Sequence, residues 1–167
     1  ETGINRISLG VQSWKDSALK ALNRRHSSAQ AARALESVAK AGFENITLDL
    51  IYGIPGMSHG EWSENIDFSL AFDIRHLSAY HLTIEPGTVF GKMLEKGLIS
   101  EIDEEDSAAQ FNTLLEKTEK AGFIHYEISN FCLPGFESRH NTKYWTGAPY
   151  YGFGNSAAGA GNGYLFT

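Results

Sequence analysis

The chain has 167 residues, of which 42% are hydrophobic and 20% charged, and its formal net charge is −6. This composition is typical of a soluble globular domain with a real core, and the negative charge argues against nucleic acid or an anionic membrane as the main partner. No apolar run approaches the roughly 18 residues of a membrane span. The single cysteine, Cys132, excludes an internal disulfide and a multi-cysteine metal cluster made by this chain alone, and it fits a reducing cytoplasm. We therefore expect a cytoplasmic protein.

Predicted strands alternate with predicted helices along the chain. Apolar residues in alternation or in short runs indicate the strands, and apolar faces at helical spacing indicate the helices. Two helix starts carry the spacing of a capping box, Ser27 with Gln30 and Ser58 with Glu61. The expected order is strand 4–11, helix 15–23, helix 27–41, strand 45–52, helix 60–72, strand 76–84, helix 89–95, helix 103–121 and strand 124–129. Residues 134–167 are expected to form loops, with one short strand near Tyr150.

This alternation predicts a parallel sheet joined by right-handed crossovers. Four such units do not close an eight-stranded barrel, which needs roughly 200 or more residues. We expect an α/β fold, a partial (β/α) barrel with four to five parallel strands and flanking helices over residues 1–133, followed by the loop-rich segment 134–167. A complete small doubly wound domain is the alternative. In the first interpretation the chain is part of a larger protein.

A lone carboxylate, Asp49, lies in the otherwise apolar strand 45–52. Ligand sites in parallel α/β folds lie at the carboxyl ends of strands, where Gln12 and Thr83 also follow, and Arg24 comes just after the first helix. Together these groups suit a small zwitterionic ligand with hydroxyl groups. The alternatives are purely structural roles: Asp49 pairs with a neighbouring donor, and Gln12 and Thr83 are strand-end caps.

The stretch His140–Trp145 reads H-N-T-K-Y-W in a loop-like context. Imidazole is a metal ligand, and aromatic side chains line flat apolar pockets. The alternative is a loop pinned by Trp145 under the barrel rim. The G-F-G-N-S-A run at 152–157 matches a dinucleotide-binding pattern, but no strand precedes it and no helix follows it, so it indicates a tight turn.

Several motifs, in order along nearly the whole chain, resemble the radical S-adenosylmethionine (SAM) family of oxygen-independent coproporphyrinogen III oxidase and its relatives. They are N-R-I-S-L-G-V-Q-S at 5–13, D-L-I-Y-G-I-P-G at 49–56, S-A-Y at 78–80 and I-E-P-G-T at 84–88. The segments Y-E-I-S-N-F at 126–131 and S-R-H-N-T-K-Y-W at 138–145 are more specific and resemble the HemW branch of that family, the haem chaperones.

The resemblance implies a partial (β/α)₆ barrel that works with SAM, a [4Fe-4S] cluster and haem. Carried over by position, Gln12, Arg24, Asp49 and Thr83 match SAM contacts, and Ile51 packs near the adenine. Asp49 and Gln12 would serve the ribose, and Arg24 the methionine carboxylate.

The same resemblance assigns His140, Asn141, Tyr144 and Trp145 to haem, with His140 as the candidate ligand of the haem iron. The implied function is to bind haem and deliver it to membrane haemoproteins. One alternative is radical oxidative decarboxylation of coproporphyrinogen III, and another is a barrel fragment without activity of its own.

The sequence departs from the family pattern in three places. The C-x-x-x-C-x-x-C cluster motif and the glycine-rich motif for the SAM amino group are absent from these 167 residues. We expect both to lie upstream, so that this chain alone would neither build the cluster nor cleave SAM. The histidine that usually follows Ser-Ala in the glycine-rich segment is replaced by Ala158. The last barrel strands and a C-terminal domain are also expected to lie beyond the chain.

Overall fold

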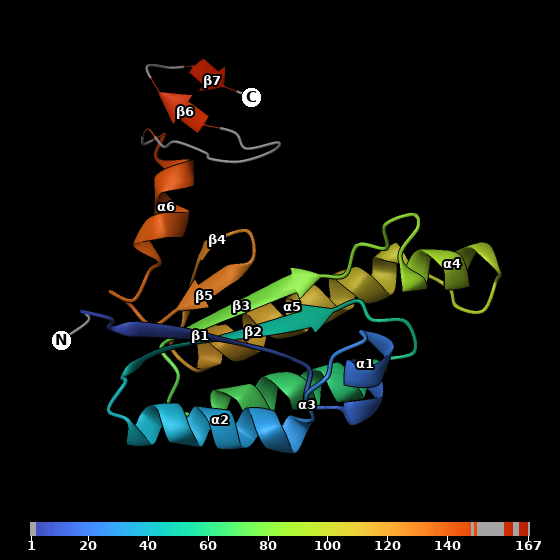
Figure 1. Ribbon diagram of the computed structural model, residues 1–167, viewed down its shortest axis with the longest axis horizontal. Coiled ribbons are helices and arrows are strands. Elements are labelled where there is room, and N and C mark those ends of the chain that lie inside the picture. The colour runs from blue at the N-terminus through green and yellow to red at the C-terminus, as the bar shows by residue number, and fades with distance from the viewer. Residues whose placement is uncertain (1–2, 148, 150–158, 162–163, 167) are drawn as a thin grey trace.

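The computed structural model describes residues 3–147, 149, 159–161 and 164–166. A five-stranded sheet in the order β1-β2-β3-β5-β4 forms its centre (Figure 1). The strands of this sheet are β1 Arg6–Gln12, β2 Asn45–Tyr52, β3 His76–His81, β4 Ile124–Glu127 and β5 Asn130–Cys132. A separate antiparallel pair joins β6 Gly159–Gly161 to β7 Tyr164–Phe166.

Helices connect the strands and lie close to the predicted positions. They are α1 Asp16–Ala21, α2 Ser28–Lys40, α3 His59–Leu70, α4 Val89–Glu95, α5 Glu104–Lys120 and α6 Arg139–Trp145. Both predicted capping boxes are present, at Ser27 for α2 and at Ser58 for α3. Within the described residues, none of these helices combines the length and apolar character needed to cross a bilayer.

The α/β class is confirmed, and β1, β2 and β3 pair in parallel as expected. The strand predicted over 124–129 is instead a hairpin, in which β4 ends at Glu127 and the chain turns through Ile128 and Ser129 into β5. β5 pairs antiparallel with both β3 and β4. Strand β4 therefore keeps the direction of the parallel strands but lies one strand further out, so three neighbouring strands are parallel rather than four or five.

The core lies between the sheet and the helices α2, α3 and α5. Leu48, Leu50 and Leu77 point from the strands into it and are completely buried. Trp62 of α3 and Leu114 of α5 meet them from the helices, also with no exposed surface. Figure 1 shows α2 and α3 side by side below the sheet, and α6 on the opposite side of it. Because strand side chains alternate, the next residue along each strand faces away from this core.

Candidate functional site

The sheet surface that faces away from the core is polar. In β2, Thr47 and Asp49 alternate with the buried leucines. The register places Thr47 beside His76, and Asp49 beside Ser78. Asn130 of β5 lies opposite Ser78. Paired residues of neighbouring strands share a face, so these side chains lie together. We call this surface the polar face; it comprises Arg6, Ser8, Thr47, Asp49, Ile51, His76, Ser78, Tyr80 and Asn130.

The polar face has a closed base and an open end. At the base, near the amino ends of the strands, Thr47 and His76 are only 3% and 1% exposed. Arg6 contributes to the closure, since its guanidinium donates to Thr47 Oγ1 at 3.1 Å and to the Phe136 carbonyl at 3.3 Å. At the carboxyl ends Asp49 is half-buried, and Tyr80 is exposed. A ligand can therefore approach the carboxyl ends of the strands.

Asp49 is held at the middle of the polar face by hydroxyl groups from both neighbouring strands. Ser8 Oγ donates to its two carboxylate oxygens at 3.1 and 3.3 Å, and the Ser78 hydroxyl donates from β3. Burial raises the pKa of the Asp49 carboxyl above its usual range, while the two serines and the positive charge of Arg6 oppose that rise. The pairing of Asp49 with neighbouring donors, expected if its role is structural, is thus present. The residue is also only half-buried.

Gln12 ends β1 in a strained backbone conformation. Its φ is +67°, in the left-handed region that residues other than glycine rarely adopt, and the register with β2 slips between Gly10 and Gln12. The side chain folds back over Gly10, where an added Cβ would lie 2.6 Å from Gln12 Nε2. Such strain persists where the surrounding structure enforces it and is frequent at functional sites.

The segment after Gln12 is fixed by Asn65, a residue that the sequence prediction did not single out. Asn65 is 1% exposed on α3, and its Oδ1 accepts from Ser13 Oγ at 3.1 Å and from the Trp14 amide. Its own amide donates to the Glu61 carbonyl at 2.7 Å. A buried asparagine in the middle of a helix is the sequence signal for this role, because a buried amide requires partners.

The exit from β2 is fixed in a similar way by Gln110 of α5. Gln110 is 2% exposed, and its Oε1 accepts from the Gly53 amide at 3.0 Å. Gly53 has a φ of +72°, and His81 lies so close that an added Cβ would be 2.8 Å from its Nε2. Thr83 follows β3 and lines a hollow of about 170 Å³ together with Gly53 and His81. Thr83 therefore lies at the carboxyl edge of the sheet, as predicted.

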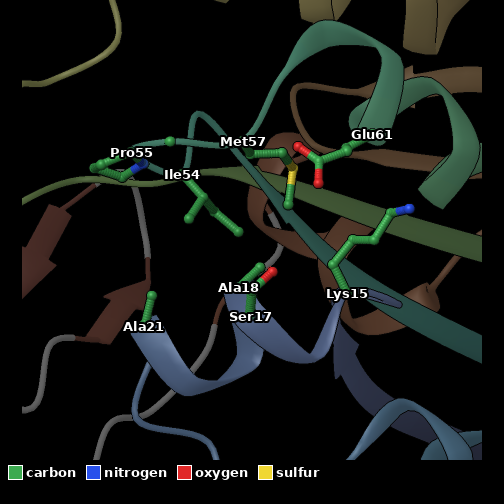
Figure 2. A pocket seen from close by; sticks show the side chains of 9 residues that line it. Lys15, Ser17, Ala18, Ala21, Ile54, Pro55, Met57 and Glu61 are labelled. Atoms are coloured by element: carbon green, nitrogen blue, oxygen red, sulfur yellow. The ribbon is translucent and has the colours of Figure 1, made fainter.

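Arg24 lies in the exposed loop after α1, two residues before His26, which is hydrogen-bonded to β1. His26 Nε2 donates to the Val11 carbonyl at 3.1 Å, which brings this loop to the end of β1. Helix α1 also packs under the loop that follows β2. Figure 2 shows Ile54 and Met57 extending from that loop toward Ala18 of α1, around a hollow of about 100 Å³. The hollow lies where α1, which follows β1, packs against the loop that follows β2.

The H-N-T-K-Y-W stretch is a helix, so the predicted loop is wrong. Ser138 caps α6, and its Oγ accepts from the Asn141 amide at 3.4 Å. Trp145 is 60% exposed, which also contradicts the alternative of a loop pinned under the barrel rim. His140 is exposed as well. At 3.6 residues per turn, positions 140, 141, 144 and 145 fall within an arc of about 140°.

The structure therefore gathers the predicted residues into two groups. Gln12, Asp49 and Ile51 lie together on β1 and β2, with Thr83 one strand further on and Arg24 in the loop tethered to β1. The α6 positions form the second group. The segment before α6 is attached to the base of the polar face, because Arg6 donates to the Phe136 carbonyl. The G-F-G-N-S-A run and the strand expected near Tyr150 lie outside the described residues.

Comparison with known proteins identifies relatives over almost the whole chain. A family model described as the radical SAM superfamily matches residues 1–69. The "Heme chaperone HemW" of Lactococcus lactis is 40% identical over 95% of this chain and 42% of its own length. The protein of the same name from Bacillus subtilis is 39% identical with the same coverage. This chain thus spans less than half the length of these curated relatives.

A solved structure shares the fold. The coproporphyrinogen III oxidase HemN of Escherichia coli, described as a radical SAM enzyme, superposes with a TM-score of 0.71 over 95% of this chain and 39% of that one. At 18% identity, this likeness supports the fold alone. It agrees with the partial barrel predicted from the order of strands and helices.

Proposed function

We propose that this chain belongs to the radical SAM superfamily and is part of a haem chaperone that binds haem on α6 and passes it to haemoproteins. The observation that carries the proposal is that positions 140, 141, 144 and 145 fall on one side of helix α6, in a chain 40% identical to a protein named as a heme chaperone. Membrane haemoproteins are the proposed recipients, and the single cysteine supports a cytoplasmic location.

Helix α6 offers what a flat, largely apolar ligand with a metal centre requires. The imidazole of His140 is exposed and is the proposed ligand of the haem iron. Trp145, 60% exposed, is proposed to cover part of the porphyrin plane. Positions 141 and 144 complete the same side of the helix, so we assign Asn141 and Tyr144 to the haem site as well.

The open end of the polar face is the proposed SAM site. We propose that the Asp49 carboxylate accepts from the ribose hydroxyls together with Gln12 at the end of β1, and that Arg24, from the loop after α1, pairs with the methionine carboxylate. We assign Ile51 to the adenine and Thr83 to the same site. SAM together with an iron–sulfur cluster supplies radical chemistry, and the role of this chain is to bind and orient SAM.

The residues of this chain do not fit the cluster itself. Among the described residues, no group of three or more His, Cys, Asp or Glu side chains could hold a metal ion. Cys132 is completely buried, and burial raises the pKa of its thiol to about 11, whereas a cluster requires thiolates. We propose that the cluster ligands belong to another part of the protein.

The proposal is tested by titrating the full-length protein with haem and following the Soret absorbance. We expect saturable binding that His140→Ala weakens at least tenfold, because the variant would remove the proposed ligand of the haem iron. His59→Ala is the matched control, since His59 is also an exposed helical histidine, located on α3. Equal weakening by both variants would argue against a specific role of His140.

The outcomes separate the alternatives. Saturable binding that neither variant changes would keep the chaperone and remove His140 from the site. Absence of saturable binding would refute the chaperone and favour the oxidase alternative, which predicts turnover of coproporphyrinogen III under anaerobic conditions.

A further inference from the structure

A buried histidine joins β3 to β4 through a tyrosine. His76 is 1% exposed, and its Nε2 lies 2.8 Å from the hydroxyl oxygen of Tyr126. Their rings meet edge to face with centroids 5.7 Å apart. Burial, reinforced by the nearby positive charge of Arg6, lowers the pKa of His76 to about 3. The imidazole is therefore neutral at physiological pH.

The Tyr126 hydroxyl makes two hydrogen bonds. The backbone amide of Ser138 donates to its oxygen at 3.2 Å, and the second bond joins it to His76 Nε2, where either atom can be the donor. His76 Nδ1 is buried and has no partner among the described residues, so the tautomer with the proton on Nε2 leaves no buried N–H unpaired. The resulting chain runs from the Ser138 amide through the Tyr126 hydroxyl to His76.

This series of hydrogen bonds ends at the start of the helix that carries the proposed haem residues. Ser138 is the N-cap of α6, two residues before His140. A second tie lies beside it, since Arg6 donates to the Phe136 carbonyl at 3.3 Å. The start of α6 is thus attached to the buried base of the polar face, although α6 itself projects from the sheet (Figure 1).

We propose that His76 and Tyr126 are positioning residues for haem binding, which set the place and direction of α6 without touching haem. The inference rests on the proposed function of α6. It assigns to the Tyr126 hydroxyl a role distinct from core packing, since its partner Ser138 begins the haem-binding helix. A Tyr126 ring without its hydroxyl would keep the aromatic contact with His76 and release the Ser138 amide.

The experiment compares haem dissociation constants of the full-length protein and its variants. Tyr126→Phe and His76→Leu should each raise the constant about 5- to 10-fold, the size of one lost hydrogen bond. The double variant should be no weaker than the weaker single variant, because both changes break the same chain. His76→Gln should restore nearly normal affinity, since the glutamine amide can either donate to or accept from the Tyr126 hydroxyl.

A matched control is the histidine–hydroxyl contact between α3 and α5, the helices that pack on the core side of the sheet. Thr113 Oγ1 of α5 lies 2.8 Å from His59 Nε2 of α3, a histidine–hydroxyl contact of the same length. Thr113→Val should leave haem affinity and the Soret maximum unchanged.

The outcomes distinguish this inference from the proposed function. If the wild-type protein binds no haem, both fail. If it binds haem and Tyr126→Phe binds equally well with an unchanged Soret spectrum, the positioning role alone is refuted. If His76→Gln is as weak as His76→Leu, the hydrogen bond is not the cause and the inference is also overturned. Tyr126→Phe removes only the hydroxyl group, so the test does not depend on whether His76→Leu folds.

Discussion

Replacing Asp49 by asparagine should weaken SAM binding without lowering the free energy of unfolding at pH 7. The carboxylate of Asp49 is half-buried between Ser8 and Ser78, and burial raises its pKa. Asparagine has nearly the same shape and still offers an oxygen to the serine hydroxyls. The variant therefore removes the negative charge with little disturbance of packing.

The expected loss concerns SAM. A hydrogen bond to a charged group contributes about 1–3 kcal/mol, so losing the charge-assisted bonds to the ribose should weaken SAM binding by about 5- to 150-fold. Stability should not fall in parallel. Because the folded-state pKa of Asp49 is raised, its favourable contribution exists below the unfolded carboxyl pKa of about 3.9 and is lost as the pH rises through the folded-state value. At pH 7 the charge is a net cost, which Asp49→Asn removes.

The assay is calorimetric titration of the anaerobically prepared full-length protein with SAM, alongside urea unfolding at pH 4 and pH 7. Asp49→Asn should match or exceed the wild-type free energy of unfolding at pH 7, with a smaller advantage at pH 4, close to the unfolded carboxyl pKa. Asp67→Asn is the control, because Asp67 pairs with Lys117 on the outer helices and its side chain is 61% exposed. Unchanged SAM affinity in a folded Asp49→Asn protein would make Asp49 structural and refute the assignment of the ribose.

Two further predictions concern groups inside the fold. Gln110→Leu should lower the free energy of unfolding by about 1–3 kcal/mol, because the buried Gly53 amide loses its acceptor, and a change below about 0.5 kcal/mol in urea unfolding would contradict this. Cys132 should resist thiol reagents at pH 8 in the native protein and react fully in urea, because its thiol is buried and its pKa is about 11; rapid labelling of the native protein would show that the site is open.

The sequence located the three parallel strands β1, β2 and β3 and the central carboxylate because these signals are local. Asp49 stands out since a charge in an apolar strand needs compensation, and Gln12 and Thr83 follow strands whose apolar patterns are clear. Ser8 and Ser78 carry no such signal. Each looks like an ordinary polar position in an alternating strand, and only the register of β1, β2 and β3 shows that both donate to the same carboxylate.

The prediction of a loop at His140–Trp145 was wrong for a physical reason. This stretch has no apolar stripe at helical spacing, because α6 does not bury a face in the core, and Pro134 and Gly135 just upstream indicate a turn. The local signal for the helix was Ser138, whose side chain caps the first turn. An exposed helix without an amphipathic pattern is recognised from its cap, and the residues proposed to bind haem share one side of this helix.

The link between His76 and Tyr126 depends on the unpredicted strand β5. Cys132 of β5 lies between strands β3 and β4, paired with His76 on one side and with Ile124, two residues before Tyr126, on the other. Strands in a sheet are about 4.8 Å apart, so β3 and β4 are separated by roughly twice that distance. Cys132 is small, and the tyrosine ring can reach across it to place its hydroxyl 2.8 Å from His76. A larger residue at 132 should block this reach, and we expect Cys132→Leu to reproduce the haem-binding defect of Tyr126→Phe, whereas Cys132→Ser should not. Normal haem affinity in a folded Cys132→Leu protein would show that α6 is held in place without this contact.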